Sequence, residues 1–314
     1  MNEIITVNSS AIATSGNFSE GLFSKWIAYI DRKPKTVQTY TRAVRQFSKY
    51  LSDNCIAQPT RETVIAYRKE LEEKGHKPST IQAYIIALKL FFKWTAAESL
   101  YPNIADRVEG AKINRDFKKD YLTSKQTKRL MISVDRDTLK GKRDYAILSL
   151  MVTAGLRTVE VIRADIQDMK TVGDSTALFL QGKGRDERSE YVKLAEPVEE
   201  AILDYLAARG KAEPTAPLFA SVSNRDNGER LSTKSISRLV KEHFSDIGLN
   251  SDRLTAHSLR HTAAVLNLMN GGTVEETRQL LRHSDINTTL IYTHAIERAK
   301  NESEKRIASA IFGA

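Results

Sequence analysis

The sequence predicts a mainly α-helical chain, in which an N-terminal four-helix bundle precedes a mixed α+β domain with a small antiparallel β-sheet. Between residues 18 and 100, apolar residues recur at intervals of three and four, the spacing of one helix face. A basic stretch without this periodicity follows. Helical spacing then returns, and between residues 166 and 194 it gives way to short runs typical of strands.

Composition limits the possible functions of the chain. Its 314 residues are enough for two domains, and a net charge of +9 permits nucleic-acid binding without establishing it. Cys55 is the only cysteine, which excludes a disulfide framework and a cysteine-based metal site and favours a cytoplasmic protein. No apolar run approaches the roughly 20 residues that span a bilayer, so we expect no membrane association.

The N-terminal half contains a predicted tail and the bundle. Residues 1–17 are small and polar, and we expect them to form a flexible tail. Within residues 18–110, the first helix begins at Phe18, and the second follows Pro34, which suits a first helical turn. The third covers about residues 60–74. The fourth begins at Pro78, and its broad apolar surface suits the centre of a bundle.

Basic residues of the bundle and of the following segment are candidate DNA contacts. They concentrate on the second and fourth helices, although each one alone is as well explained as an ordinary surface charge. The segment 111–121 is basic and aperiodic, which predicts an interdomain linker that can lie along phosphates. The candidates in this half are Lys35, Arg42, Arg45, Lys77, Lys89 and Lys118.

The second domain, residues 122–314, opens with a short helix and then a nearly apolar, buried helix that ends at Gly155. Arg157 follows directly, where it can be held rigidly, and pairing with Glu160 three residues later explains it equally well. Two β runs, 176–180 and 190–194, flank a glycine-punctuated turn that carries Lys183 and Arg185. This turn lacks the pattern of a nucleotide-phosphate loop, so a solvated loop lysine is the default interpretation of Lys183.

Helices dominate the rest of the domain. We expect one over residues 197–208 and another over 232–247, where Lys234 and Arg238 belong to a basic stripe and are further candidate DNA contacts. A helix from about residue 257 ends at Asn270, a short one runs from Thr273 to near residue 281, and a final one covers residues 293–312.

Histidine and arginine gather near the end of the chain, before Tyr292. In the string HSLRH, His257 and Arg260 share one face of a helix, and His283 follows 22 residues later. Because the pKa of tyrosine is about 10, attack by its oxygen needs a proton acceptor or a strongly activated electrophile. A phosphodiester held by guanidinium groups is such an electrophile. Zinc binding by the histidines is disfavoured because no third ligand lies nearby.

These strings resemble the tyrosine recombinases, the phage integrase family, and within it the XerC/XerD-like branch. HSLRHTAA and LLRHSDINTTLIYTH are similar to the family's C-terminal signature, and TAGLRTVEV resembles the segment that supplies its first catalytic arginine. One position departs, because Arg282 stands where the family commonly has glycine. The resemblance covers nearly the whole chain and implies a core-binding, SAM-like helical domain at 18–110 and a catalytic domain at 122–314.

The resemblance also implies a mechanism and partners. The implied catalytic set is Arg157, Lys183, His257, Arg260, His283 and Tyr292. Tyr292 would be the nucleophile, His257 its general base and Lys183 the general acid, with neither a cofactor nor a metal. The implied partner is a double-stranded recombination site bound by a homo-tetramer linked through an exchanged C-terminal helix, or by a hetero-tetramer with a paralogue.

Three alternatives stay open at the level of sequence. A type IB topoisomerase would share the chemistry and relax DNA as a monomer. A catalytically silent DNA-binding regulator would keep the basic bundle and lose the reaction, against which the complete set of six residues argues. Among recombinases, the sequence does not separate a resolver of chromosome dimers from the integrase of a mobile element.

Overall fold

The fold comes from a computed structural model that describes residues 18–112, 120–182, 187–224 and 226–313, and only the backbone of residues 294–295 and 297–300. The chain forms two compact units, residues 1–115 and 116–314. Five expectations fall wholly or mostly outside the described residues: the flexible tail at 1–17, the linker at 111–121, Lys118, Lys183 and Arg185.

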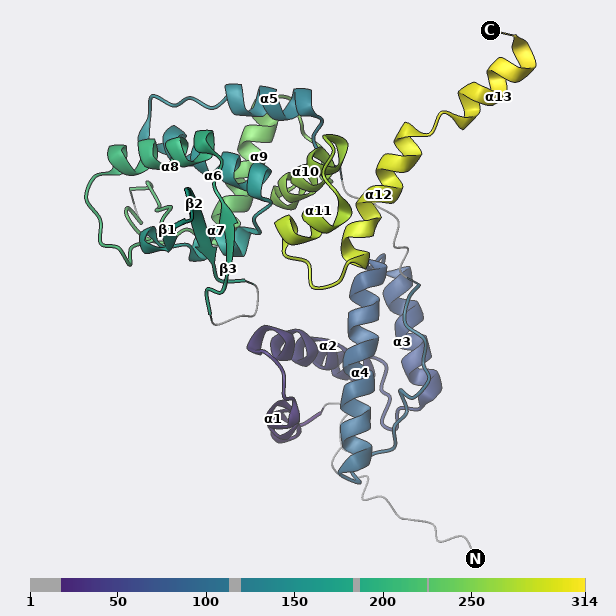
Figure 1. The fold of residues 1–314 in the computed structure, drawn as a ribbon. Coiled ribbons are helices and arrows are strands. Elements are labelled where there is room, and N and C mark those ends of the chain that lie inside the picture. The colour runs from purple at the N-terminus through teal and green to yellow at the C-terminus, as the bar shows by residue number, and fades with distance from the viewer. Residues whose placement is uncertain (1–17, 113–119, 183–186, 225, 314) are drawn as a thin grey trace, which may run out of the picture. The chain divides into compact units, whose positions relative to one another are not determined.

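The N-terminal unit is the predicted four-helix bundle. Its core is aromatic: Trp26 meets Phe91 edge-on at 5.2 Å between ring centroids, and Phe47 meets Phe92 at 6.0 Å. More residues are buried in α4 than in any other helix of this unit, and α4 packs against α2 and α3 (Figure 1). The four helices are α1 (Glu20–Tyr29), α2 (Pro34–Asp53), α3 (Arg61–Glu73) and α4 (Pro78–Ala97).

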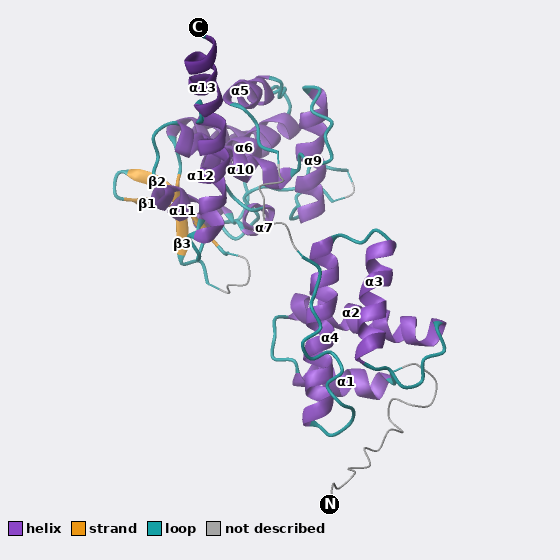
Figure 2. Ribbon diagram, turned by 90° about the vertical axis from the view of Figure 1, so that its right-hand side faces the viewer, coloured by secondary structure: helices purple, strands orange, loops and turns teal. Residues whose placement is uncertain are grey.

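The C-terminal unit combines helices with one small sheet, so the predicted mainly α fold class is confirmed (Figure 2). The sheet has three antiparallel strands in the order β1 (Met169–Val172), β2 (Ser175–Leu180) and β3 (Glu190–Lys193), beside the 3-10 turn η2 (Ile166–Asp168). The helices are α5 (Ser124–Ile132), α6 (Leu139–Ala154), α7 (Thr158–Arg163), α8 (Glu196–Arg209), α9 (Thr233–Asp246), α10 (Ala256–Met269), α11 (Val274–Leu281), α12 (Asn287–Lys300) and α13 (Ser303–Phe312).

Helix α6 organises this unit because most of its side chains are buried, and it packs against both α8 and α10. It ends at Gly155, whose φ of +60° is in the left-handed region that glycine adopts without strain. The reversal places Arg157 at the start of α7. On the other side, α10, α11 and α12 pack against one another (Figure 1).

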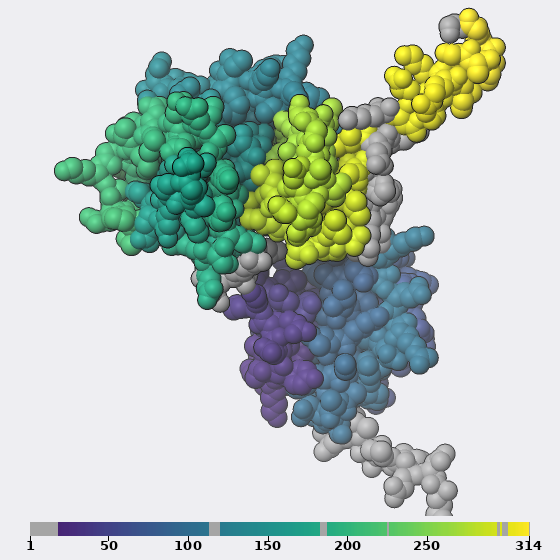
Figure 3. All heavy atoms as spheres, viewed as in Figure 1, coloured from purple at the N-terminus to yellow at the C-terminus, as the bar shows by residue number. Residues whose placement is uncertain are grey.

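The predicted single helix at 293–312 is wrong. Tyr292 lies inside α12, which begins at Asn287 and ends at Lys300, and the separate helix α13 begins at Ser303. Asn301 interrupts the helix, since its Oδ1 accepts a hydrogen bond from the backbone N–H of Ser303 at 2.9 Å. No residue of α13 is buried, and Figure 3 shows this helix (yellow) projecting from its unit.

A helix that crosses a bilayer must be both long and apolar. Within the described ranges, no helix meets both requirements.

Candidate active site

A cationic pocket lies where the start of α7 meets α10 and the end of α11. Its volume is about 290 Å³. Residues that are 131 positions apart in the sequence reach it because α6 and α10 pack together and α11 folds back onto α10. The lining residues are Arg157, His257, Arg260, Arg282, His283, Ser284 and Thr288. Four of the six residues predicted to be catalytic therefore line one pocket.

Arg157 is fixed by the carboxylate of Glu160. Its Nη1 donates to Glu160 Oε1 at 2.7 Å, and its backbone N–H donates to Oε2 at 2.8 Å. Burial alone would raise the pKa of Glu160, but Arg282 and Arg157 outweigh it and hold that pKa below its usual value. The ion pair considered from the sequence is thus present, and it leaves the Arg157 side chain 27% exposed at the pocket wall.

Arg260 is almost completely buried, with 1% of its surface exposed. Its Nη1 donates to the carbonyl of Gly155 and its Nη2 to the carbonyl of Leu281, so the helix ends of α6 and α11 hold the guanidinium. Burial, assisted by the charges of Arg157 and Arg282, lowers its pKa to about 9. The group still carries its positive charge at neutral pH, because two carbonyl dipoles and the nearby Glu160 carboxylate partly compensate for the burial.

Tyr292 contacts a histidine through its hydroxyl. The hydroxyl oxygen lies 2.5 Å from His261 Nδ1, and both residues are buried. Burial raises the pKa of Tyr292 to about 12, although Arg260 and Arg157 act in the opposite direction. The ring of His261 packs edge-on against that of His257, with centroids 4.6 Å apart, and His257 is exposed at the pocket.

His283 is held in the neutral form. Its Nδ1 is 2.9 Å from Thr289 Oγ1, and 9% of the residue is exposed. Burial, followed by the charges of Arg260, Arg157 and Arg282, lowers its pKa to about 4. An imidazole that is neutral at working pH can donate a hydrogen bond through one ring nitrogen to an anionic oxygen without adding charge.

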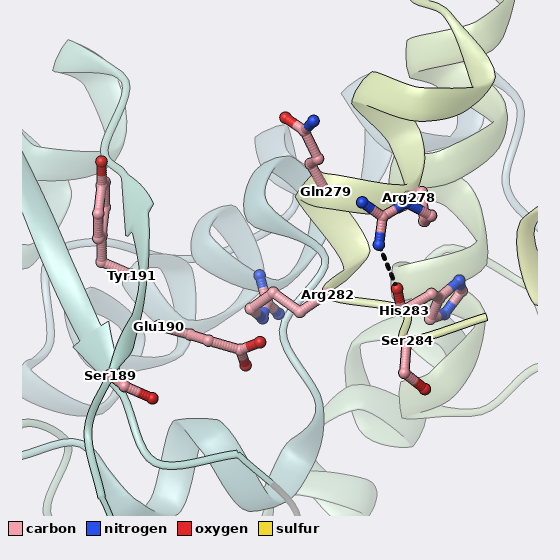
Figure 4. Close-up of a pocket in the computed structure, with 8 residues that line it drawn as sticks. All are labelled: Ser189, Glu190, Tyr191, Arg278, Gln279, Arg282, His283 and Ser284. Carbon is pink, nitrogen blue, oxygen red and sulfur yellow. Dashed lines mark hydrogen bonds between the residues drawn. The ribbon is translucent and has the colours of Figure 1, made fainter. Parts of the chain in front are cut away.

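A second pocket, of about 360 Å³, adjoins the first and shares Arg282, His283 and Ser284 with it. In Figure 4, Glu190 on β3 faces the Arg282 side chain across this pocket. Arg278 donates to the carbonyl of His283 at 2.8 Å, which fixes the turn after α11.

The predicted DNA contacts are mostly exposed, as they must be whether they bind DNA or are ordinary surface charges. Lys89 is half-buried, and Arg45 and Arg238 form ion pairs with Glu20 and Glu242 at 3.1 and 3.7 Å. The remaining described candidates are exposed on α2, at the start of α4 and on α9: Lys35, Arg42, Lys77 and Lys234.

Two residues at the site were not assigned roles from the sequence. The spacing of four between His257 and His261 predicts that both lie on one helix face, but it assigns no role to His261. The resemblance distinguishes Arg282 only as a departure from a common glycine. Its φ of +53° explains why glycine suits this position, and its guanidinium lines the pocket.

Among the described residues, no three His, Cys, Asp or Glu side chains gather in a way that would hold a metal ion.

Known proteins are similar to this chain in sequence over both of its units. A sequence model of the phage integrase family matches residues 120–298, and one of the phage integrase N-terminal SAM-like domain matches residues 24–99. A tyrosine recombinase of Synechococcus elongatus is 28% identical over 293 residues, which cover 89% of this chain and 91% of that protein. Tyrosine recombinase XerC of Chlamydia trachomatis is 31% identical over 247 residues, 77% of this chain and 75% of XerC.

Solved structures share the fold. The XerH site-specific recombinase, in a post-cleavage complex with palindromic difH substrate, has a TM-score of 0.69 at 18% identity, over 98% of this chain and 93% of XerH. The lambda integrase dimer bound to a COC' core site has a TM-score of 0.68 at 18% identity, over 86% of this chain and 96% of that one. The chain belongs to the phage integrase family and is a tyrosine recombinase of the XerC-like type.

Proposed function

We propose that the chain cuts and rejoins DNA at specific sites through a covalent 3′-phosphotyrosine. The observation that carries this proposal is the convergence of Arg157, Arg260 and His283 on one pocket. The charges of both arginines also act on the Tyr292 hydroxyl, where they oppose the increase in pKa that burial causes. The two guanidinium groups would bind the non-bridging oxygens of the scissile phosphate and stabilise the charge that builds in the transition state. His283 would add a neutral hydrogen bond.

In the first step, the Tyr292 oxygen forms a bond to phosphorus while the bond from phosphorus to the 5′ oxygen breaks. The resemblance assigns the tyrosine proton to His257. The hydrogen bond at 2.5 Å favours His261 as the group that receives it first, with His257 as the adjacent imidazole at the pocket wall. The 5′ oxygen leaves as a hydroxyl after accepting a proton, for which the resemblance offers Lys183, outside the described residues.

Rejoining is the reverse attack, by a 5′ hydroxyl on the phosphotyrosine. Because the phosphodiester energy is retained in that bond, the exchange needs neither ATP nor a metal. Two successive exchanges, through a Holliday junction, recombine two sites. Relaxation by a topoisomerase-like reaction would use the same covalent step, but the relatives that resemble this chain are named as recombinases, which favours recombination.

We further propose that four copies act on two sites and that α13 links them. This helix offers Ile307, Ile311 and Phe312 to solvent, at 58, 66 and 79% exposure. Such an apolar end gains stability by docking on another surface. A second copy of the chain is the occupant that the resemblance implies, a paralogue would serve equally, and the cytoplasm is the compartment that suits both.

The test is incubation with a nicked duplex that carries the site recovered by a binding selection. The wild-type protein should form a protein–DNA adduct that survives denaturant, and Tyr292→Phe should form none. The same adduct from Tyr292→Phe would refute the nucleophile. Arg157→Ala should lose cleavage while its duplex affinity stays within a few-fold, because many other phosphate contacts hold the DNA. The recovered site also separates a resolver from an integrase.

A further inference from the structure

Arg282 ends α11 in a backbone conformation that favours glycine. Its φ and ψ are +53° and +47°, in the left-handed region where a side chain crowds the following carbonyl. Glycine, which is common at this position in the family, adopts these angles without strain. An arginine here therefore strains the backbone, and contacts of its side chain must compensate.

Those contacts are numerous and buried. Only 4% of the Arg282 side chain is exposed. Its Nη1 donates to the carbonyl of Leu280 at 2.7 Å, and its Nη2 donates to Glu160 Oε2 at 2.8 Å. Glu160 is completely buried, so a cation is needed beside it if it is to stay ionised. The guanidinium thus ties the end of α11 to the start of α7.

Glu160 connects Arg282 to the pocket's first arginine. One carboxylate oxygen, Oε1, binds the Arg157 guanidinium, and the other, Oε2, binds both the Arg157 backbone N–H and Arg282. With Arg282 in place, the carboxylate cannot turn both oxygens toward the Arg157 guanidinium. Without it, Glu160 would be free to pair more closely with Arg157, in competition with a bound phosphate.

We propose that Arg282 is a positioning residue for strand cleavage, which acts through Glu160 to hold Arg157 in the geometry that binds the scissile phosphate. The inference rests on the proposed function, because it concerns the same reaction. It differs from the family pattern, in which a glycine at this position offers no such contact. The side chain takes part by fixing one of the groups that bind the phosphate, and its charge also lies at the pocket wall.

The test compares single-turnover cleavage and duplex affinity for Arg282→Gly and Arg282→Lys on the same nicked substrate. Arg282→Gly should slow cleavage by about tenfold to a hundredfold, the usual effect of misplacing a catalytic group, with the Kd changed by less than about threefold. Arg282→Lys should restore part of the rate, because lysine keeps the positive charge but lacks the planar guanidinium that donates to two acceptors at once. If the glycine variant is unstable, the lysine variant still tests the proposal.

Two further measurements separate positioning from a general loss of structure. If Arg282 acts through Glu160, the loss in the double variant Glu160→Gln with Arg282→Gly should be close to that of Glu160→Gln alone. The pKa of His283, followed by NMR, should rise in Arg282→Gly because a neighbouring cation is lost. Losses that multiply in the double variant would refute the route through Glu160.

Arg107 supplies a matched control in the other unit. It has a φ of +51° and an exposed side chain whose nearest ion pair, to Asp106, spans 3.6 Å. Arg107→Gly should leave the cleavage rate within about twofold of wild type. A wild-type protein that forms no adduct would refute the proposed function itself. A wild-type adduct with an equal rate from Arg282→Gly would overturn only the role of Arg282.

Discussion

Replacing His261 with glutamine tests which imidazole takes the proton of Tyr292. The tyrosine hydroxyl lies 2.5 Å from His261 Nδ1, and both residues are buried. Glutamine offers an amide oxygen that can accept the same hydrogen bond, but it cannot take up a proton at neutral pH. The substitution therefore removes the base while leaving the hydroxyl a partner.

The expected magnitude follows from the environment of Tyr292. Its pKa is about 12, so at pH 7 roughly one hydroxyl in 10⁵ is ionised. Ionising the hydroxyl at this pH therefore costs about 7 kcal/mol of free energy. A base that accepts the proton during attack typically contributes about 10²- to 10⁴-fold. We expect His261→Gln to slow adduct formation by about 100-fold or more, and His257→Gln to slow it less, since only His261 is in the hydrogen bond described above.

The assay is single-turnover adduct formation on a nicked duplex between about pH 6 and about pH 9. The wild-type rate should level off once the base is neutral. For His261→Gln, the rate should rise about tenfold per pH unit over the whole range, because it follows the ionised fraction of a tyrosine whose pKa is about 12. If His261→Gln formed the adduct within about threefold of the wild-type rate while His257→Gln was slowed about 100-fold, the general base would be His257 and not His261.

Three further predictions concern stability and assembly. Gly155→Ala should lower the unfolding free energy by about 1–3 kcal/mol in denaturant titrations, since φ is +60° and the new Cβ would lie 2.6 Å from Leu281 Cδ2; an unchanged midpoint would contradict this. Because the folded His283 has a pKa of about 4 and an unfolded histidine about 6.5, the unfolded chain binds the extra proton between these values. As pH drops from about 6.5 to about 4, the free energy of unfolding of the wild type should therefore fall relative to that of His283→Gln. Parallel curves of unfolding free energy against pH would exclude this effect of burial. Ile311→Ser with Phe312→Ser should weaken oligomerisation on DNA in sedimentation, with duplex binding by one copy retained; unchanged assembly would exclude α13 as the link.

Periodicity alone predicted most of the fold. The bundle helices and α10 each carry an apolar face or a clear boundary signal, such as Pro34 at a helix start or Asn270 at a helix end, and these local features determine where a helix begins and ends. The first strand of the sheet was not identified, although Gly173 with a φ of +61° makes a short turn between β1 and β2. Half of that strand is exposed and it is only four residues long, so its alternation is too brief to stand out.

The candidate site was less predictable, because its geometry depends on contacts between distant segments. The sequence paired Arg157 with Glu160 through their spacing of three, and the structure contains that pair. It could not indicate that Glu160 also binds Arg282, which is 122 residues away, because this contact requires α11 to fold back on α10, which itself packs against α6. Nor could spacing decide between His257 and His261, since both lie on one face of α10.

The charges at the site explain why the pocket is ready for a phosphate. Arg157 and Arg282 share the single carboxylate of Glu160, and Arg260 is held by backbone carbonyls. Within this described set of contacts, three guanidinium groups thus meet one carboxylate. Burial lowers the pKa of Arg260 and of His283, and the excess of positive charge lowers both further. Such an arrangement costs stability in the free protein and is compensated when an anion binds. A scissile phosphate would supply that anion, and its charge increases in the transition state, where the fixed arginines stabilise it most.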